Sequence, residues 1–138
     1  MNIIITLAGH SNRFAIDGYK TPKFLLKLGN KYMIEHVISM FDQDDDFIFI
    51  LNNDQKKYLN KLKKITKNLI KKLKFIFIKP HFNGPAYSIK MSKVTVNLDN
   101  FIISYCDFFT NWNYKKFLRT VYGYSAAASS FKGFHPAS

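Results

Sequence analysis

The sequence predicts an α/β protein, with three layers in which helices cover both faces of a mostly parallel central sheet. Short runs of apolar, β-forming residues recur along the chain, and segments with apolar residues at helical spacing separate them. Strands that alternate with helices form right-handed β-α-β units, whose strands lie parallel. The chain has 138 residues, enough for a hydrophobic core, and we expect a single domain over 1–138.

Five apolar runs predict the strands. The first, at 1–8, is continuous and predicts a strand buried on both faces that ends at Gly9. The runs at 47–51 and 75–78 predict two more strands, and Pro80 stops the second of them. A fourth strand is predicted at 101–106, and a fifth, made of small residues, at 124–131.

Four segments predict helices. Residues 32–41 carry apolar side chains at helical spacing. Asn53 or Asp54 is expected to cap the next helix. The apolar face of that helix is predicted to comprise Tyr58, Leu62, Ile65, Leu69 and Leu73. Further helices are expected from Gly84, with Pro85 in the first turn, and over 114–121.

Composition narrows the class of protein. The 47% hydrophobic and 22% charged residues are typical of a globular chain, not a disordered one. No apolar run approaches the roughly 18 residues of a membrane span, so no membrane insertion is expected. The single cysteine, Cys106, cannot form an internal disulfide, which favours a cytoplasmic location.

The net charge of +12 comes largely from the lysine-rich stretch 56–74. We favour a solvated helix face, because no arginine or aromatic residue is interleaved on its polar side to contact bases. The alternative is an anion-binding surface for nucleic acid or acidic lipid. Nucleic acid is therefore not the expected partner.

Three polar loops follow predicted strands, at 9–13, 79–86 and 106–111. In open α/β sheets ligands bind beyond the carboxyl ends of the strands, so these loops are expected to meet at one edge. Gly9 lets backbone N–H groups approach an anion closely. Arg13 and Lys23 add positive charge suited to phosphate. The four histidines have no metal-ligand spacing.

The motifs in order resemble a known family. "LAGHSNRF", then "GYKTPKFLL" and "MIEHVI", is similar to the signature of the sugar-nucleotide nucleotidyltransferases, which show L-A-G-x-G-x-R-F, P-K-x-L and then a helix. "GPA" stands where that family carries G-T-A, and "SYCDF" where it carries a strand that ends in a metal-binding Asp. The resemblance implies a Rossmann-like fold of the nucleotide-diphospho-sugar transferase type.

The resemblance also implies roles for particular residues. Arg13 would hold the β- and γ-phosphates of a nucleoside triphosphate, Lys23 the α-phosphate, and Asp107 a Mg²⁺ ion; these three are the expected catalytic residues. The expected nucleotide-binding residues are Leu7, Ala8, Gly9, His10, Ser11, Asn12, Arg13, Lys23, Lys79, Asn83, Gly84, Pro85 and Ala86. The structural alternatives are surface ion pairs for Arg13 and Lys23, a helix cap for Asp107, and a plain helix start for Gly84 and Ala86.

The sequence departs from the family pattern at three positions and at its end. Ser11 replaces the second glycine, Pro85 replaces a threonine, and Lys79 stands where many members carry a base-reading glutamine. The family's domain continues past "FKGFHP", so the nucleotide-binding portion is expected to be incomplete, with the second metal ligand missing. We expect such a chain to bind nucleotide weakly and to transfer it hardly at all.

The implied reaction transfers a nucleotidyl group from a triphosphate to a phosphorylated acceptor and releases pyrophosphate. A sugar 1-phosphate is the leading acceptor, for capsule or other surface polysaccharide. Alternatives are a cytidylyltransferase with a non-sugar acceptor such as phosphocholine or a phosphorylated amino-acid amide, an inactive nucleotide-binding module, and an anion-binding protein built on the lysine-rich stretch. Self-association into a homo-oligomer stays open.

Overall fold

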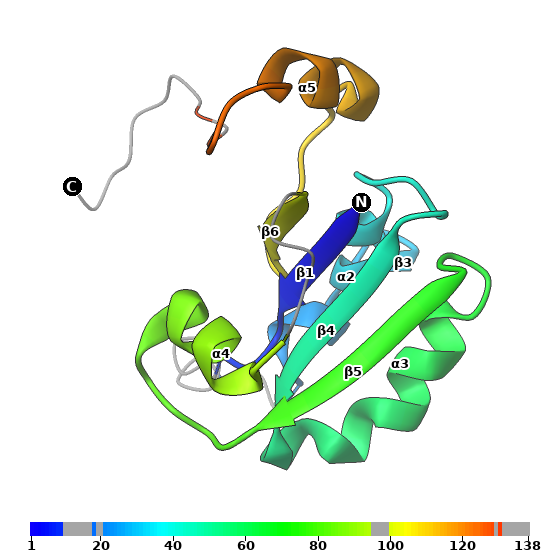
Figure 1. Cartoon of the computed structure of the whole chain (residues 1–138). Coiled ribbons are helices and arrows are strands. Elements are labelled where there is room, and N and C mark those ends of the chain that lie inside the picture. Colours follow the sequence, from blue (N-terminus) through cyan, green and yellow to red (C-terminus); the bar gives the residue numbers. More distant parts are fainter. Residues whose placement is uncertain (10–17, 19–20, 95–99, 129, 131–138) are drawn as a thin grey trace.

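Four parallel strands form the central sheet in the order β5-β4-β1-β6 (Figure 1). Their bounds are Asn2–Thr6 for β1, Asp46–Asn52 for β4, Lys72–Ile78 for β5 and Phe101–Tyr105 for β6. The computed structural model describes residues 1–9, 18, 21–94, 100–128 and 130. Because the four strands run in the same direction, the loops that follow β1, β5 and β6 all leave the sheet at the same end.

Helical segments connect the strands. The α-helices of the described residues are α2 (Met33–Ile38), α3 (Leu59–Thr66), α4 (Gly84–Ser92) and α5 (Tyr114–Val121). Two 3-10 helices, η1 (Lys23–Leu25) and η2 (Asn53–Tyr58), and the antiparallel pair β2 (Lys27–Leu28) and β3 (Lys31–Tyr32) complete the described elements.

Different helices cover the two faces of the sheet. Ile3 and Ile5 belong to a core shared with α2 and α3, whereas Ile4 packs in a smaller core against Ile89 of α4. Successive strand residues point to opposite faces, which is why a continuous apolar run was needed in β1. Figure 1 shows α4 in front of the sheet and α3 behind it. The predicted three-layer α/β fold is confirmed.

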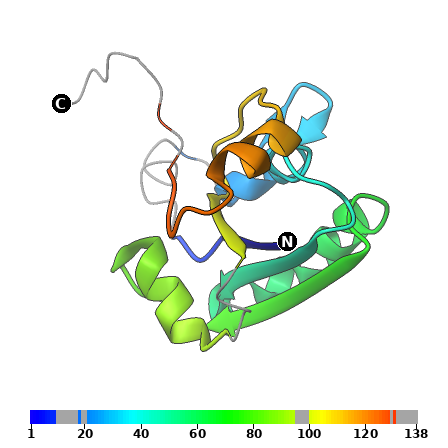
Figure 2. The ribbon, with the colours of Figure 1, turned by 45° about the horizontal axis from the view of Figure 1, so that its top comes forward.

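The outer strand β6 carries the least cover. Phe101, Ile103 and Tyr105 share the face on which α4 lies, yet Ile103 is 49% exposed. The helix α4 contacts β5, β4 and β1 instead. The helix α5, in orange, lies nearer β6 than β5 in both views of the ribbon (Figures 1 and 2).

Two sequence predictions about the lysine-rich stretch are wrong. The cap is Asn52, whose side chain accepts a hydrogen bond from the Gln55 N–H, not Asn53 or Asp54. The stretch is also not one helix, because α3 ends at Thr66 and β5 already begins at Lys72. The β5 strand begins earlier than predicted because Lys72 already pairs with Asp46 of β4. The hydrogen bonds of this pairing come from a neighbouring strand, and the local sequence pattern gives no sign of them.

The predicted fifth strand is also wrong over 124–128, which form no strand and are exposed. The small residues there, three of them alanines, bury too little apolar surface to hold a further strand on the sheet. Residues 129 and 131 of the same prediction lie outside the described residues.

Candidate functional site

A cavity of about 380 Å³ lies at the carboxyl ends of β1 and β6. All three predicted loops contribute to it, through Gly9, Gly84 and Asp107. The residues that line it are Thr6, Leu7, Ala8, Gly9, Lys23, Phe24, His81, Phe82, Gly84, Pro85, Ser88, Tyr105, Cys106 and Asp107. The parallel sheet thus brings together at the carboxyl ends of its strands residues as far apart in sequence as Thr6 and Asp107.

The charged part of the cavity is an ion pair. Lys23 Nζ donates to Asp107 Oδ2 at 2.8 Å, and both side chains are partly exposed. Pro22 precedes Lys23 in extended conformation, so the ammonium enters at the start of η1. A helix-cap role for Asp107 is ruled out, because α5 begins only at Tyr114 and its cap is Asn113. The pair therefore sets an anion and a cation side by side in a ligand-sized hollow.

A buried amide clasp holds the first loop. Asn52 Nδ2 donates to the Ala8 carbonyl at 3.0 Å, and Gln55 Nε2 donates to the Leu7 carbonyl at 2.9 Å. The two amides also bond to each other's backbone in a capping box, at 2.9 and 3.2 Å. Leu7 and Ala8 are consequently fixed by the start of η2, which positions the backbone of the cavity wall.

The loop before α4 forms the opposite wall. Gly84 has a φ of +80°, a left-handed conformation that glycine adopts without strain, and Pro85 follows in the first turn of α4. Gly84 and Pro85 line the cavity, as expected for nucleotide-binding residues. The other expected residues of this loop, Lys79, Asn83 and Ala86, are exposed and do not line it.

Four expected binding residues, His10, Ser11, Asn12 and the proposed catalytic Arg13, lie outside the described residues.

Sequence reasoning missed several polar residues of the cavity. Thr6 is buried and its Oγ1 has no hydrogen-bond partner among the described residues. Ser88 is buried and forms a hydrogen bond with His81. The spacing of these two residues in the sequence did not indicate that they are partners. The parallel register that sets Thr6 beside Tyr105 could have indicated that both reach this edge.

Cys106 lies next to the ion pair, but its thiol is unreactive. Its sulfur is enclosed although the residue as a whole is only half-buried. Burial, followed by the negative charge of Asp107, raises the pKa of the Cys106 thiol to about 12. A thiol with that pKa is protonated at neutral pH and is a poor nucleophile.

The donor set of the cavity suits a metal held mainly by its ligand. Among the described residues no three His, Cys, Asp or Glu side chains come together as a metal site, and Asp107 is the carboxylate that lines the cavity. Mg²⁺ commonly takes one or two carboxylates and completes its shell with phosphates and water. The residues present therefore fit a Mg²⁺ that arrives with a nucleotide, not a protein-only site.

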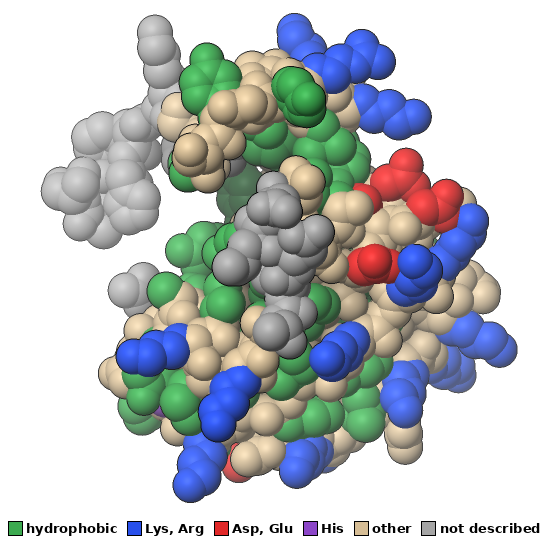
Figure 3. All heavy atoms as spheres, in the orientation of Figure 1, with side chains coloured by type: hydrophobic (Ala, Val, Ile, Leu, Met, Phe, Trp, Pro, Cys, Tyr) green, Lys and Arg blue, Asp and Glu red, His purple; other side chains and the backbone are tan. Residues whose placement is uncertain are grey.

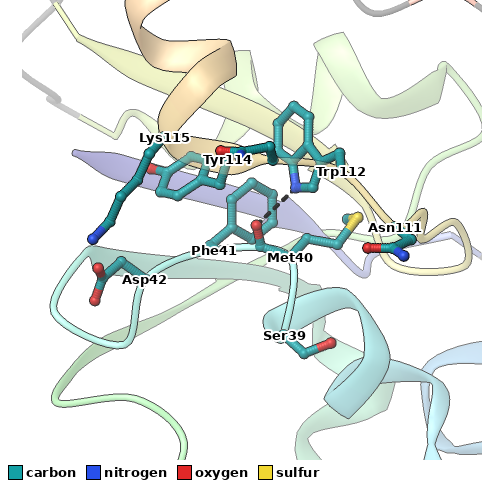
Figure 4. Close-up of a pocket in the computed structure, with 9 residues that line it drawn as sticks. Ser39, Met40, Phe41, Asp42, Asn111, Trp112, Tyr114 and Lys115 are labelled. Atoms are coloured by element: carbon teal, nitrogen blue, oxygen red, sulfur yellow. Dashed lines mark hydrogen bonds between the residues drawn. The ribbon is translucent and has the colours of Figure 1, made fainter.

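A larger hollow of about 570 Å³ lies between the end of α2 and the start of α5, where Asn111, the last residue of the third loop, is among its lining residues (Figure 4). Trp112 Nε1 donates to the Met40 carbonyl at 2.8 Å across its floor. Phe41 packs edge-to-face on Trp112 and Tyr114. This hollow is open and none of its lining residues belongs to the loops at the carboxyl ends of β1 and β5, so we place the site in the smaller cavity.

On the face seen in Figure 3, Lys and Arg side chains are scattered over the lower half and along the right and upper margins, and they do not form one continuous patch. Lys71 and Lys72 are paired with Asp44 and Asp46 near the start of β4. In the described part of the chain, none of the helices has the length and apolarity needed to cross a bilayer.

Comparison with solved structures bears on the fold. The nucleoside-diphosphate-sugar pyrophosphorylase of Vibrio cholerae RC9 superposes with a TM-score of 0.62 at 22% identity, over 80% of this chain and 51% of that one. HddC from Yersinia pseudotuberculosis gives a TM-score of 0.70 at 21% identity, over 88% and 54%. A UDP-glucose pyrophosphorylase in complex with UDP-glucose gives 0.56 at 18% identity, over 77% and 45%.

The chain shares the fold of these three proteins. It spans about half the length of each of them. No protein-family model matches the sequence, and no curated protein matches it either. At identities near 20% the likeness establishes the architecture, and the chemistry has to be argued from the cavity.

Proposed function

We propose that the cavity binds a nucleoside triphosphate with Mg²⁺ and that the protein transfers the nucleotidyl group to a phosphorylated acceptor. The observation that carries the proposal is the convergence of the Gly9 loop, the start of α4 and the Lys23–Asp107 pair on one cavity. The shared fold of sugar-nucleotide pyrophosphorylases supports it. The capsule-type acceptor, a sugar 1-phosphate, rests on the sequence resemblance.

The reaction requires positioning and charge neutralisation, not a protein nucleophile. A phosphate oxygen of the acceptor would bond to the α-phosphorus, and the bond from that phosphorus to the bridging oxygen would break, releasing pyrophosphate. Lys23 would neutralise charge that develops on the α-phosphate, and Arg13 would hold the departing phosphates. In-line displacement of this kind leaves the unreactive thiol of Cys106 without a role.

Asp107 has two partners in this scheme. Without ligand its carboxylate accepts from Lys23. With ligand it would hold a Mg²⁺ ion, which would supply positive charge to offset that of the triphosphate, and Lys23 would then be available to phosphate. In the ion pair, Lys23 and Asp107 neutralise each other. A triphosphate with Mg²⁺ would replace both partners, because its phosphate would pair with Lys23 and its metal ion with Asp107.

The test is calorimetry of the chain with CTP, UTP, dTTP and GTP, each with and without Mg²⁺, beside a pyrophosphate-release assay with sugar 1-phosphates. Saturable binding of one triphosphate that requires Mg²⁺ is expected, and Asp107→Asn should raise the Mg²⁺ concentration that this binding needs. Binding without any pyrophosphate release would favour the nucleotide-binding module. A folded chain that binds none of the four triphosphates would contradict the proposal.

A further inference from the structure

We propose that His81 is a positioning residue that holds the 79–84 loop in the conformation needed for nucleotide binding. The inference rests on the proposed function for its ligand, but its structural part stands on contacts within the loop. His81 lines the cavity between β5 and α4 and has no counterpart among the motifs that carry the family resemblance.

The imidazole of His81 joins the loop to the helix. Its Nδ1 accepts a hydrogen bond from the Asn83 backbone N–H at 3.1 Å. Its Nε2 lies 3.0 Å from Ser88 Oγ, on the second turn of α4. The ring also packs edge-to-face against Tyr87, with 4.8 Å between the centroids. One side chain therefore contacts residues two, six and seven positions further along the chain.

These partners assign the proton. A ring nitrogen that accepts an amide N–H carries no hydrogen, so in the neutral ring the hydrogen is on Nε2 and is donated to Ser88 Oγ. The Ser88 hydroxyl is then directed to the Gly84 carbonyl, 3.4 Å away. Ser88 is only 3% exposed, so this chain of hydrogen bonds is anchored in the protein interior.

The same assignment argues against a catalytic serine. Activation of a serine requires an unprotonated ring nitrogen facing its hydroxyl, whereas here Nε2 donates to Ser88 Oγ and the hydroxyl faces Gly84. The contacts of His81 are suited to fixing a backbone conformation.

The hydrogen bond between His81 and Asn83 resembles the one that defines an Asx turn. In such a turn an Asn or Asp side chain accepts the N–H two residues ahead, as His81 Nδ1 does for Asn83. The turn leads directly into Gly84, whose φ of +80° redirects the chain into α4. Without the imidazole the loop would have to be ordered by the ligand, and binding would weaken by that ordering cost.

Because an Asn side chain can form the same turn, His81→Asn and His81→Leu are a matched pair of variants that test the role of the Nδ1 bond. His81→Asn keeps an acceptor for the Asn83 N–H and should bind the preferred triphosphate within about threefold of wild type. His81→Leu removes both bonds of the ring and should weaken binding about tenfold or more. His36→Leu is the control, since His36 bonds to the Leu28 carbonyl and stacks on Phe109 away from the cavity; it should leave affinity unchanged.

Two readouts separate this inference from the proposed function. Amide hydrogen exchange of Asn83, measured without ligand, should be faster in His81→Leu and protected in His81→Asn. Affinity for inorganic tripolyphosphate, which has no nucleoside, should change less than about twofold in both variants. If the wild type binds no triphosphate, the proposed function fails while exchange still tests the loop.

Several results would overturn the inference. Unchanged triphosphate affinity in a folded His81→Leu, or equal weakening in His81→Asn and His81→Leu, would show that the Nδ1 bond does not position the loop. Unchanged Asn83 exchange in His81→Leu would do the same. If His81→Leu does not fold, Ser88→Ala keeps the Nδ1 bond but removes the Nε2 partner and the hydroxyl that faces the Gly84 carbonyl, and it should still weaken binding about threefold.

Discussion

Lys23 and Asp107 are separated by 84 residues, yet their charged atoms lie 2.8 Å apart. Both side chains retain solvent contact, at 28% and 36% exposure, so water screens the pair and its contribution to folding is small. The contribution of the pair to folding therefore does not account for its placement, and a role in ligand binding is the prediction to test.

Replacing Lys23 with Met tests that prediction. The free energy of unfolding should change by less than about 1 kcal/mol, because the ion pair is partly exposed. In a chain of full family length, turnover in the pyrophosphate-release assay should fall by roughly 10²–10³ if Lys23 neutralises transition-state charge. Urea unfolding and that assay, or triphosphate affinity by calorimetry where turnover is too low, provide the measurements.

Lys31→Met is the matched control for that experiment, since it removes the same charge from an exposed position on β3. Its affinity and turnover should equal those of the wild type. Equal losses in the two variants would mean that net charge, not the location of Lys23, determines binding.

Among the elements, the junction between β4 and η2 links the sheet to the cavity. Asn52 and Gln55 are both buried, and their amide groups bond to carbonyls of Leu7 and Ala8 that are 44 or more residues earlier. A capping box that ordinarily serves one helix end here also fixes the loop after β1.

Asn52→Ala should therefore destabilise the protein more than the loss of an ordinary helix cap does. We expect a loss of about 2–3 kcal/mol in the free energy of unfolding, because the variant leaves the Ala8 carbonyl and the Gln55 N–H without their partners in a buried setting. Asn113→Ala, which removes an exposed cap that accepts only from the Lys116 N–H, should cost about 1 kcal/mol. Denaturant unfolding of both variants decides whether burial makes the difference.

The charged side chains of the lysine-rich stretch face solvent and do not line the cavity. Lys63 and Lys64 are exposed on α3 while Leu62 and Thr66 face the core, and Lys71 pairs with Asp44. This agrees with the solvated face expected from its amphipathic pattern.

Changing Lys63, Lys64, Lys71 and Lys72 together to Gln should leave triphosphate affinity within about twofold, because these side chains do not line the cavity. Fluorescence anisotropy with duplex DNA, titrated with salt, is the companion measurement. Tight binding of the wild type to DNA that falls steeply with salt and disappears in the variant would favour the anion-binding alternative.

At the scale of the whole molecule, Asp45 ties three distant segments together. Its carboxylate accepts from the Tyr114 hydroxyl at 2.7 Å and lies 3.1 Å from the amino-terminal ammonium. It thereby joins α5 to the starts of β1 and β4, at the end of the sheet opposite the cavity. Burial, and then the bond to Asp45, raise the pKa of Tyr114 above its ordinary value.

That shift has a definite sign for stability. A folded-state pKa above the unfolded value means that the contribution of Tyr114 is fully present below about pH 10 and is lost as pH rises further, when only the unfolded chain ionises. Tyr114→Phe should lower the free energy of unfolding by about 1–2 kcal/mol at pH 7 and reduce its decline above pH 10. Thermal or urea unfolding across pH 7–11 measures both, and a variant with an unchanged alkaline slope would contradict the assignment.

The sequence by itself determined the three-layer fold and the convergence of the three loops. Alternating apolar runs and helical spacing are local signals, and parallel strands necessarily bring the loops that follow them to one edge. That reasoning located Lys23, Gly84 and Asp107 at the cavity, although the roles given to them, and to Arg13 outside the described residues, stay predictions.

Only the tertiary structure decided how the site is held. The bonds of Asn52 and Gln55 to the first loop, and the early start of β5 at Lys72, depend on neighbours brought close by the fold. The His81–Ser88 bond depends on the turn at Gly84 in the same way. Periodicity describes which face of an element is apolar, but a hydrogen-bond partner is chosen by distance in space, which a one-dimensional pattern does not contain.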